Sequence, residues 1–436
     1  MKPKMSAHFE ARTPSAIRLA QIEFAKRTDG TKAINTAIGN VSLPMHPAMR
    51  ERMFNLNSKN SPFKDGVVKY TATVGLEETN KAFLNIISSS GFNTDGLFSQ
   101  ITDGGSQGME LVVVGVCGPA GSQEKPLLLI DAAYTNYKAM AERTGRPIIS
   151  VSRHLEETGK FSMPDLDEVN RLIEKNKPGA MVVIPYDNPT GHFIDQQTLI
   201  ELAKLCTNNN MWMISDEAYR ELFYVNSKPA SIWGVTEEIV PGITGRRISI
   251  ETTSKVWNAC GLRTGALVTD NKDFHERSVA EATASLCSNA IGQYIFGAMA
   301  HVSLEELKHW YTKQRTYYFE MLAAFTEDLK SRLPGIIISS PDASIYSVVD
   351  VRNIAKPGFD ALDFVLWCAT QGKVNVNGIN TTLLVSPMAG FYNVGKGERN
   401  PGKTQMRIAY VESPENMKKV PLLFAKLFNQ YEKKRD

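Results

Sequence analysis

The sequence predicts an α/β protein built on a doubly wound, mostly parallel sheet. Short apolar runs alternate with longer amphipathic stretches over roughly 200 residues, and this alternation is typical of that class. The apolar runs lie at 126–130, 180–184, 212–214 and 247–250. Each run ends on polar or turn-forming residues. Because ligands bind such sheets at the carboxyl ends of the strands, we expect the functional residues to follow these runs.

The C-terminal third has a different pattern, which predicts a second and smaller α+β domain. Long charged helical stretches occupy 304–333 and 415–434. Strand candidates lie at 336–340, 345–351 and 404–410. We expect a bridging helix near 290–330, between the two parts of the chain.

Composition favours a cytoplasmic enzyme and argues against several other classes. The chain has 436 residues, with 49 basic and 46 acidic side chains and a net charge of +3, which is too balanced to indicate binding to nucleic acid or to an anionic membrane. Its five cysteines are widely spaced and include no CxxC pair, so we expect reduced intracellular thiols and no zinc site. Residues 1–12 lack the apolar region of a signal peptide, and 282–304 is too polar for a membrane span.

Five motifs follow the expected strands or open a helix. They are TDGGSQ at 102–107, YDNPTG at 186–191, SDEAYR at 215–220, TTSK at 252–255 with GLRTG at 261–265, and MRI at 406–408. Asp216 stands 28 residues after Asn188, and Arg263 stands eight residues after Lys255. In order and spacing, the chain resembles the class I/II aminotransferases, which are fold-type-I pyridoxal-phosphate enzymes, from Ser15 to about Glu432. Within them it is similar to a bacterial aspartate aminotransferase-like branch.

The resemblance implies a particular architecture. A large domain at 51–290 would hold pyridoxal 5'-phosphate on a seven-stranded, mostly parallel sheet. Residues 1–50 would join the smaller domain, and 291–436 would contain the bridging helix and the rest of that domain. The family also implies a homodimer with shared active sites, because Tyr70 matches a tyrosine that reaches the neighbouring subunit's phosphate.

The resemblance assigns the catalytic roles to residues after three strands. Lys255 would form the Schiff base with the cofactor and then move the substrate's proton. Asp216 would pair with the pyridine nitrogen and keep it protonated, so that the ring acts as an electron sink. Asn188 and Tyr219 would donate hydrogen bonds to the phenolate oxygen of the cofactor and lower the pKa of the Schiff base.

The remaining cofactor contacts surround the phosphate and the ring. Backbone amides and hydroxyls at a helix N-terminus bind phosphate well. The residues implied for the phosphate are Gly105, Ser106, Gln107, Thr252, Ser254 and Arg263. Tyr134 would stack on the pyridine ring, although this chain has Ala132 where the family pattern has a proline.

The substrate side leaves the donor open. Arg407 would grip the α-carboxylate with two parallel hydrogen bonds, and Gly39 and Asn188 would contact the same substrate. The segment 279–292 contains no Lys or Arg, which argues against the usual recognition of a dicarboxylate. The branch resemblance nevertheless points to aspartate, so both an aspartate-type donor and a neutral or aromatic donor remain.

Three functions remain open for this sequence. The first is a ping-pong aminotransferase that acts on an L-amino acid and a 2-oxo acid. The second is another fold-type-I enzyme, such as a carbon–sulfur β-lyase, which keeps the same cofactor cage. The third is a regulatory module behind a DNA-binding domain, which is disfavoured because the family pattern begins by Ser15 and Lys255 is present. We expect the aminotransferase, without a metal.

Overall fold

A seven-stranded sheet forms the centre of the larger part of the protein. The computed structural model describes residues 3–117, 125–339, 341–395 and 397–435. The strand order is β2-β8-β7-β6-β5-β3-β4, and β8 alone runs antiparallel to its neighbours. The strands are β2 (Phe98–Thr102), β3 (Leu127–Asp131), β4 (Ile148–Ser152), β5 (Ala180–Val183), β6 (Trp212–Asp216), β7 (Arg247–Thr252) and β8 (Gly265–Thr269). The predicted mostly parallel sheet is confirmed, and four of its strands are the four apolar runs.

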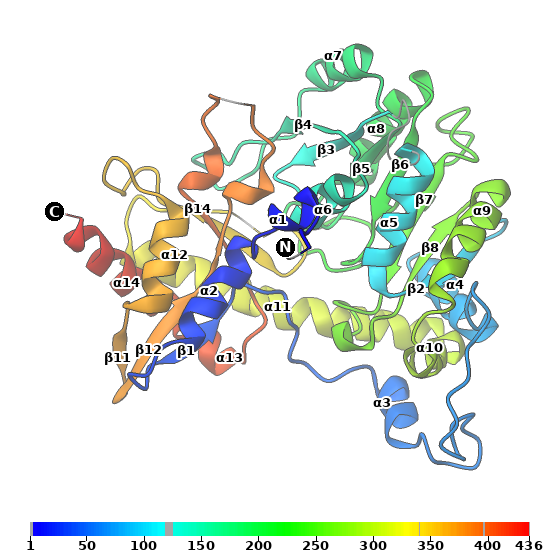
Figure 1. The fold of residues 1–436 in the computed structure, drawn as a ribbon, viewed down its shortest axis with the longest axis horizontal. Helices are drawn as coiled ribbons and strands as arrows, with labels where there is room; N and C mark the ends of the chain where they lie inside the picture. The colour runs from blue at the N-terminus through cyan, green and yellow to red at the C-terminus, as the bar shows by residue number, and fades with distance from the viewer. Residues whose placement is uncertain (1–2, 118–124, 340, 396, 436) are drawn as a thin grey trace.

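Helices cover both faces of this sheet (Figure 1). Alternate residues of one strand enter two different cores, since Leu127 and Leu129 pack on one face while Leu128 and Ile130 pack on the other. One face carries α5 (Gly104–Cys117), α6 (Thr135–Arg143) and α9 (Lys272–Ala282). The other carries α4 (Glu77–Ser89), α7 (Leu166–Asn176), α8 (Gln196–Asn208) and α10 (Ala290–Gly297). Strands that are apolar on both faces therefore sit between two helical layers.

The two ends of the chain meet in a second, smaller unit. There β1 (Lys32–Asn35) pairs in parallel with β12 (Ile379–Leu384), which also pairs with β11 (Val374–Val376). A four-stranded sheet has the order β13-β14-β10-β9. Its strands are β9 (Ile337–Ile338), β10 (Tyr346–Asp350), β13 (Ser386–Pro387) and β14 (Gln405–Ala409). The helices beside these sheets are α2 (Ala16–Ala25), α12 (Ala361–Thr370), α13 (Pro414–Met417) and α14 (Val420–Lys434).

Two predicted helices are divided in the structure. The bridging helix expected near 290–330 is α10 followed by a short turn and then α11 (Leu304–Arg332). The second helix begins there because Ser303 caps it by accepting a hydrogen bond from the Glu306 amide at 3.2 Å. The helix expected at 415–434 divides into α13 and α14, and Pro421 lies in the first turn of α14, where its missing N–H costs nothing. Of the strand expected at 336–340, only β9 forms, and Ser340 lies outside the described residues.

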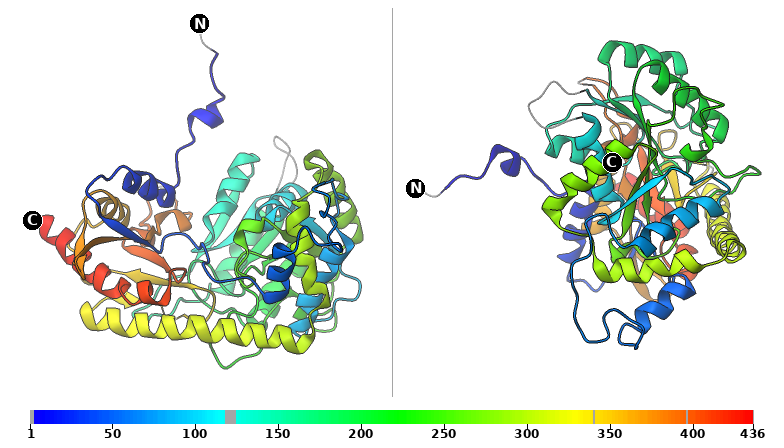
Figure 2. Two further views of the ribbon diagram at one scale, coloured as in Figure 1. Left: turned by 90° about the horizontal axis from the view of Figure 1, so that it is seen from below. Right: turned by 90° about the vertical axis from the view of Figure 1, so that its right-hand side faces the viewer.

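The N-terminal region extends outward from these two units. Helix α1 (Ala7–Glu10) lies on a segment that projects away from the body, as Figure 2 shows. Helix α3 (Pro47–Phe54) precedes an irregular stretch that runs along the outside of the larger unit before α4 begins. No helix in the described part of the chain is long and apolar enough to cross a membrane.

Candidate active site

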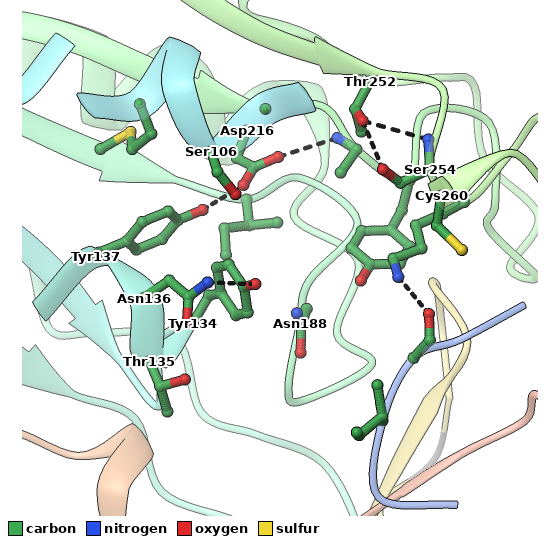
Figure 3. A pocket seen from close by; sticks show the side chains of 18 of the residues that line it. Ser106, Tyr134, Thr135, Asn136, Tyr137, Asn188, Asp216, Thr252, Ser254 and Cys260 are labelled. Atoms are coloured by element: carbon green, nitrogen blue, oxygen red, sulfur yellow. Dashed lines mark hydrogen bonds between the residues drawn. The ribbon is translucent and has the colours of Figure 1, made fainter. Parts of the chain in front are cut away.

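The predicted motifs converge on one cavity at the carboxyl ends of the strands. The loops that follow β3, β5, β6 and β7 reach it together with the N-terminus of α5 and several segments of the smaller unit. The predicted residues that line it are Gly39, Gly105, Ser106, Tyr134, Asn188, Asp216, Tyr219, Thr252, Ser254, Lys255, Arg263 and Arg407. Figure 3 shows labelled side chains from several of these loops pointing into the common space. The doubly wound topology therefore explains why residues far apart in sequence meet here.

Asp216 is a half-buried carboxylate at the end of β6 without a cationic partner among the described residues. One oxygen accepts a hydrogen bond from the Ala218 amide at 3.1 Å, and the other accepts one from the Tyr137 hydroxyl (Figure 3). Burial raises the pKa of Asp216 above its ordinary value of 3.8, although the Tyr137 bond acts in the opposite direction. A carboxylate in this environment favours a cationic ligand group, because a nearby positive charge would offset its desolvation.

Lys255 lies in the loop after β7, and its amine donates a hydrogen bond to the carbonyl oxygen of Gly39. The next residues anchor this loop to α11. The indole nitrogen of Trp310 donates to the carbonyl oxygen of Val256 at 2.9 Å, and the rings of Trp257 and Trp310 stack with centroids 6.3 Å apart and planes 5° apart. Contacts with α11 thus fix the backbone next to Lys255, while the lysine side chain lines the cavity.

One end of the cavity has the composition of an anion site. Gly105 and Ser106 lie in the first turn of α5, where backbone amides have no partner within the helix. The hydroxyls of Thr252 and Ser254 are 2.8 Å apart. The guanidinium of Arg263 lies over Gly104, since a Cβ added to that glycine would be 2.5 Å from a terminal nitrogen of the arginine. These groups offer amides, hydroxyls and a positive charge to a phosphate.

Arg407 on β14 is a buried guanidinium that lacks a carboxylate partner in the described part of the chain. Its terminal nitrogens donate to the side-chain oxygen of Asn188 and to the carbonyl of Ala37, each at 2.8 Å. Its Nε atom is buried without a hydrogen-bond partner. A buried cation without an anion has a desolvation cost, and a bound carboxylate would offset this cost at Arg407.

A buried ion pair joins two loops of the site. Arg153 pairs with Asp187 at 2.8 Å, and both side chains are almost fully buried. The same guanidinium donates to the carbonyl of Ala132 at 2.9 Å. The pair therefore connects the loop that carries Tyr134 with the loop that carries Asn188. Ala132 occupies the place where a proline was expected, and Arg153 holds that backbone instead.

Two predicted residues lie outside the lining of the cavity. The side chain of Gln107 turns back and accepts a hydrogen bond from the Asp103 amide at 2.7 Å, which caps its own helix. Tyr70 is 78% exposed on the irregular stretch before α4. Within one chain, neither side chain forms a hydrogen bond with another predicted site residue in the part of the chain that the structure describes.

Several lining residues were not predicted from the sequence, and Tyr137, Tyr346 and Arg18 are among them. Tyr137 follows Tyr134 by one helical turn, so the start of a helix near 135 was the signal that could have found it. The hydroxyl of Tyr346 is 2.8 Å from that of Tyr219. Tyr346 lies on the face of β10 that also presents Arg407 of β14, and only the strand register reveals this.

Comparison with known proteins identifies the family. The profile described as Aminotransferase class I and II matches residues 65–418, which is most of the chain. The chain belongs to this family. It is a transferase of the pyridoxal-phosphate-dependent aminotransferase type, as the resemblance of its motifs predicted. The matches do not favour the alternative of a carbon–sulfur lyase.

The relatives share the fold at low sequence identity. An aspartate aminotransferase from Musicola paradisiaca is 23% identical over 332 residues, which cover 74% of this chain and 76% of that protein. A single mutant of Thermus thermophilus aspartate aminotransferase has a TM-score of 0.79 at 20% identity, covering 98% of this chain and 100% of that one. Pyrococcus horikoshii kynurenine aminotransferase has a TM-score of 0.77 at 18% identity, covering 98% and 97%. These likenesses confirm fold type I.

Proposed function

We propose that the cavity binds pyridoxal 5'-phosphate and transfers an amino group from an L-amino acid to a 2-oxo acid. The observation that supports this proposal is the charge arrangement around Lys255. Among the described residues, the half-buried carboxylate of Asp216 has no cationic partner and the buried guanidinium of Arg407 has no anionic partner. A pyridinium ring and an α-carboxylate supply those two missing charges, so the residues present fit the cofactor and the substrate.

Each residue has a defined task in this proposal. When bound, the cofactor supplies an electron sink for the substrate's α-carbon. The Lys255 amine carries the proton removed from that carbon and returns it elsewhere. Arg407 and Asn188 hold the α-carboxylate, which fixes the direction of the Cα–H bond. Asp216 holds the ring nitrogen, and Tyr219 donates to the cofactor's phenolate oxygen.

The phosphate would be bound at the N-terminus of α5. The amides of Gly105 and Ser106, the hydroxyls of Thr252 and Ser254 and the guanidinium of Arg263 form that corner of the cavity. Tyr134, at the start of α6, would cover one face of the ring. Gln107 would act through its own helix cap, which fixes the amides of this turn.

We also infer a homodimer in the cytoplasm. Tyr70 projects from a stretch that exposes Val67 and Val68 as well, at 52% and 56%. Exposed apolar residues on an irregular segment favour a protein contact, and a second copy would place Tyr70 near its phosphate corner. The cysteine pattern supports the cytoplasm. The division into 1–50, 51–290 and 291–436 remains part of this proposal.

A cation in the cavity favours donors that carry a side-chain carboxylate. Arg18, in the first turns of α2, lines the cavity but is assigned neither to the phosphate nor to the α-carboxylate. It donates to the side-chain oxygen of Gln21 at 3.2 Å, and no carboxylate of the described residues pairs with it. We propose that Arg18 attracts the distal carboxylate of aspartate or glutamate, in place of a cation within 279–292.

The test is an absorption spectrum of the purified protein with cofactor, before and after single amino acids are added without an oxo acid. We expect the band of the lysine-bound cofactor to convert to that of the aminated cofactor. Lys255→Ala should lose both the band and turnover, whereas Lys204→Ala, on the exposed face of α8, should retain them. If the band of the lysine-bound cofactor never converts while pyruvate and ammonia appear, the result favours the lyase. If the wild type shows no such band, the proposal is refuted.

A further inference from the structure

A pair of tyrosine hydroxyls connects the two units of the protein beside the catalytic lysine. The Tyr219 hydroxyl, in the loop after β6, is 2.8 Å from the hydroxyl of Tyr346 on β10. Both side chains are buried, at 4% and 2% exposure. Because β6 belongs to the seven-stranded sheet and β10 to the four-stranded sheet, this hydrogen bond joins the larger unit to the smaller one.

The Tyr346 hydroxyl lies among the groups that act on the substrate and cofactor. A Cβ added to Gly39 would overlap this hydroxyl and would lie 3.1 Å from the amine nitrogen of Lys255. The guanidinium carbon of Arg407 is 4.3 Å from the centroid of the Tyr346 ring. The ring thus supports the arginine, and the hydroxyl is directed to the region between Gly39, Lys255 and Tyr219.

A hydroxyl donates one hydrogen and can accept two, and this limits how the pair is arranged. If Tyr219 donates to the cofactor's phenolate oxygen, as the proposed function requires, the bond between the two tyrosines must be donated by Tyr346. Burial raises the pKa of Tyr219 well above its ordinary value, which keeps it a donor. A hydrogen bond accepted by a donor polarises it and strengthens the bond that it makes next.

We propose that Tyr346 is a positioning residue that donates to Tyr219 and thereby strengthens the hydrogen bond from Tyr219 to the cofactor. This inference rests on the proposed function. The charged and titratable side chains that surround the pair are Lys255, Arg407, Tyr134 and Tyr318. The four come from the loop after β7, from β14, from the start of α6 and from α11.

The test uses Tyr346→Phe, which keeps the ring under Arg407 and removes only the hydroxyl. In the protein loaded with cofactor, the visible absorption is titrated against pH. We expect the midpoint of the lysine-bound cofactor to rise by about 0.5 to 1 pH unit, because one neutral hydrogen bond is lost. The matched control is Tyr410→Phe, which removes another buried hydroxyl, 3.0 Å from Ser347 and outside the cavity, and should leave the midpoint unchanged.

A double variant separates this role from a purely structural one. Tyr219→Phe should shift the midpoint at least as far as Tyr346→Phe, and the double variant should shift it no further than Tyr219→Phe alone. An unchanged midpoint in Tyr346→Phe, or full additivity of the two shifts, would overturn the inference while the wild-type band still supports the proposed function. If the wild type itself shows no band of lysine-bound cofactor, the proposed function fails instead.

Discussion

The Tyr137 hydroxyl donates a hydrogen bond to the carboxylate of Asp216 at the end of β6. This bond only partly offsets the desolvation of the carboxylate, and burial raises the pKa of Asp216 above 3.8. The unfolded chain therefore loses this proton at a lower pH than the folded chain does. Between these two pKa values the folded protein binds more protons than the unfolded chain. The contribution of Asp216 to stability therefore falls as the pH rises through this range.

Asp216→Asn should therefore stabilise the protein without cofactor at pH 7 while weakening cofactor binding. A gain of about 1 kcal/mol corresponds to on the order of 2–4 °C in Tm for a large domain. Thermal unfolding with and without pyridoxal phosphate measures both effects, and the cofactor should raise the Tm of the wild type more than that of the variant. The control is Asp95→Asn on an exposed turn. A lower Tm of the cofactor-free variant would contradict this account.

Arg407→Lys should weaken substrate binding more than it disturbs the fold. Lysine keeps the positive charge but loses the planar pair of donors, and with it the bonds now made to Asn188 and Ala37. We expect the concentration of amino acid needed for half-maximal conversion to rise by about 10- to 100-fold. Arg171→Lys on the exposed side of α7 provides the control. If the amino-acid concentration for half-maximal conversion is unchanged, Arg407 does not bind the substrate carboxylate.

A mixture of Tyr70→Ala and Lys255→Ala subunits tests whether Tyr70 serves the partner subunit. A Tyr70→Ala subunit keeps its own Lys255, and a Lys255→Ala subunit keeps its own Tyr70. If Tyr70 reaches the neighbouring site, the mixed dimer contains one complete site, and random mixing should restore about a quarter of wild-type activity. Subunits are exchanged under mild denaturant, and turnover is measured before and after. If the mixture shows only the mean turnover of the two separate variants, Tyr70 does not complete a shared site.

Arg18→Gln should change donor preference. Because Arg18 is exposed, its attraction for a distal carboxylate is screened, and we expect the preference for glutamate over glutamine to fall only by about 3- to 10-fold. The matched control is Arg12→Gln, an exposed arginine of the same N-terminal segment that pairs with Glu142 at 3.7 Å. Equal loss with glutamate and glutamine would mean that Arg18 supports the helix rather than the substrate.

The positions directly after strands were predictable, whereas contacts between distant segments were not. Asp216 ends a strand, and Asn188 and Lys255 follow buried strands within a few residues, so the topology of the sheet places them together. Tyr346 depends on how β10 and β14 align, and a change of register by one residue would turn it to the other face. Nothing in the sequence specifies that alignment.

The direction of the Gln107 side chain at the start of α5 was likewise not predictable from the sequence. The family resemblance implied that Gln107 assists the phosphate, and in the structure its carboxamide accepts a hydrogen bond from the Asp103 amide. A polar residue in the first helical turn can bind a ligand or cap the helix, and these two outcomes have the same sequence pattern. The divided bridging helix is different, because the Ser303–Glu306 pair was a visible start signal within an otherwise helical stretch.

The stacked indoles behind the lysine loop give the protein an internal optical reporter. Trp257 is two residues from Lys255, and Trp310 stacks on it from α11. Indole emission overlaps the absorption of pyridoxal derivatives, so energy transfer from this pair should dim the fluorescence as the cofactor arrives. Titration of cofactor into the apoprotein can thus be followed without any label, and replacing Trp310 with phenylalanine should remove part of that signal.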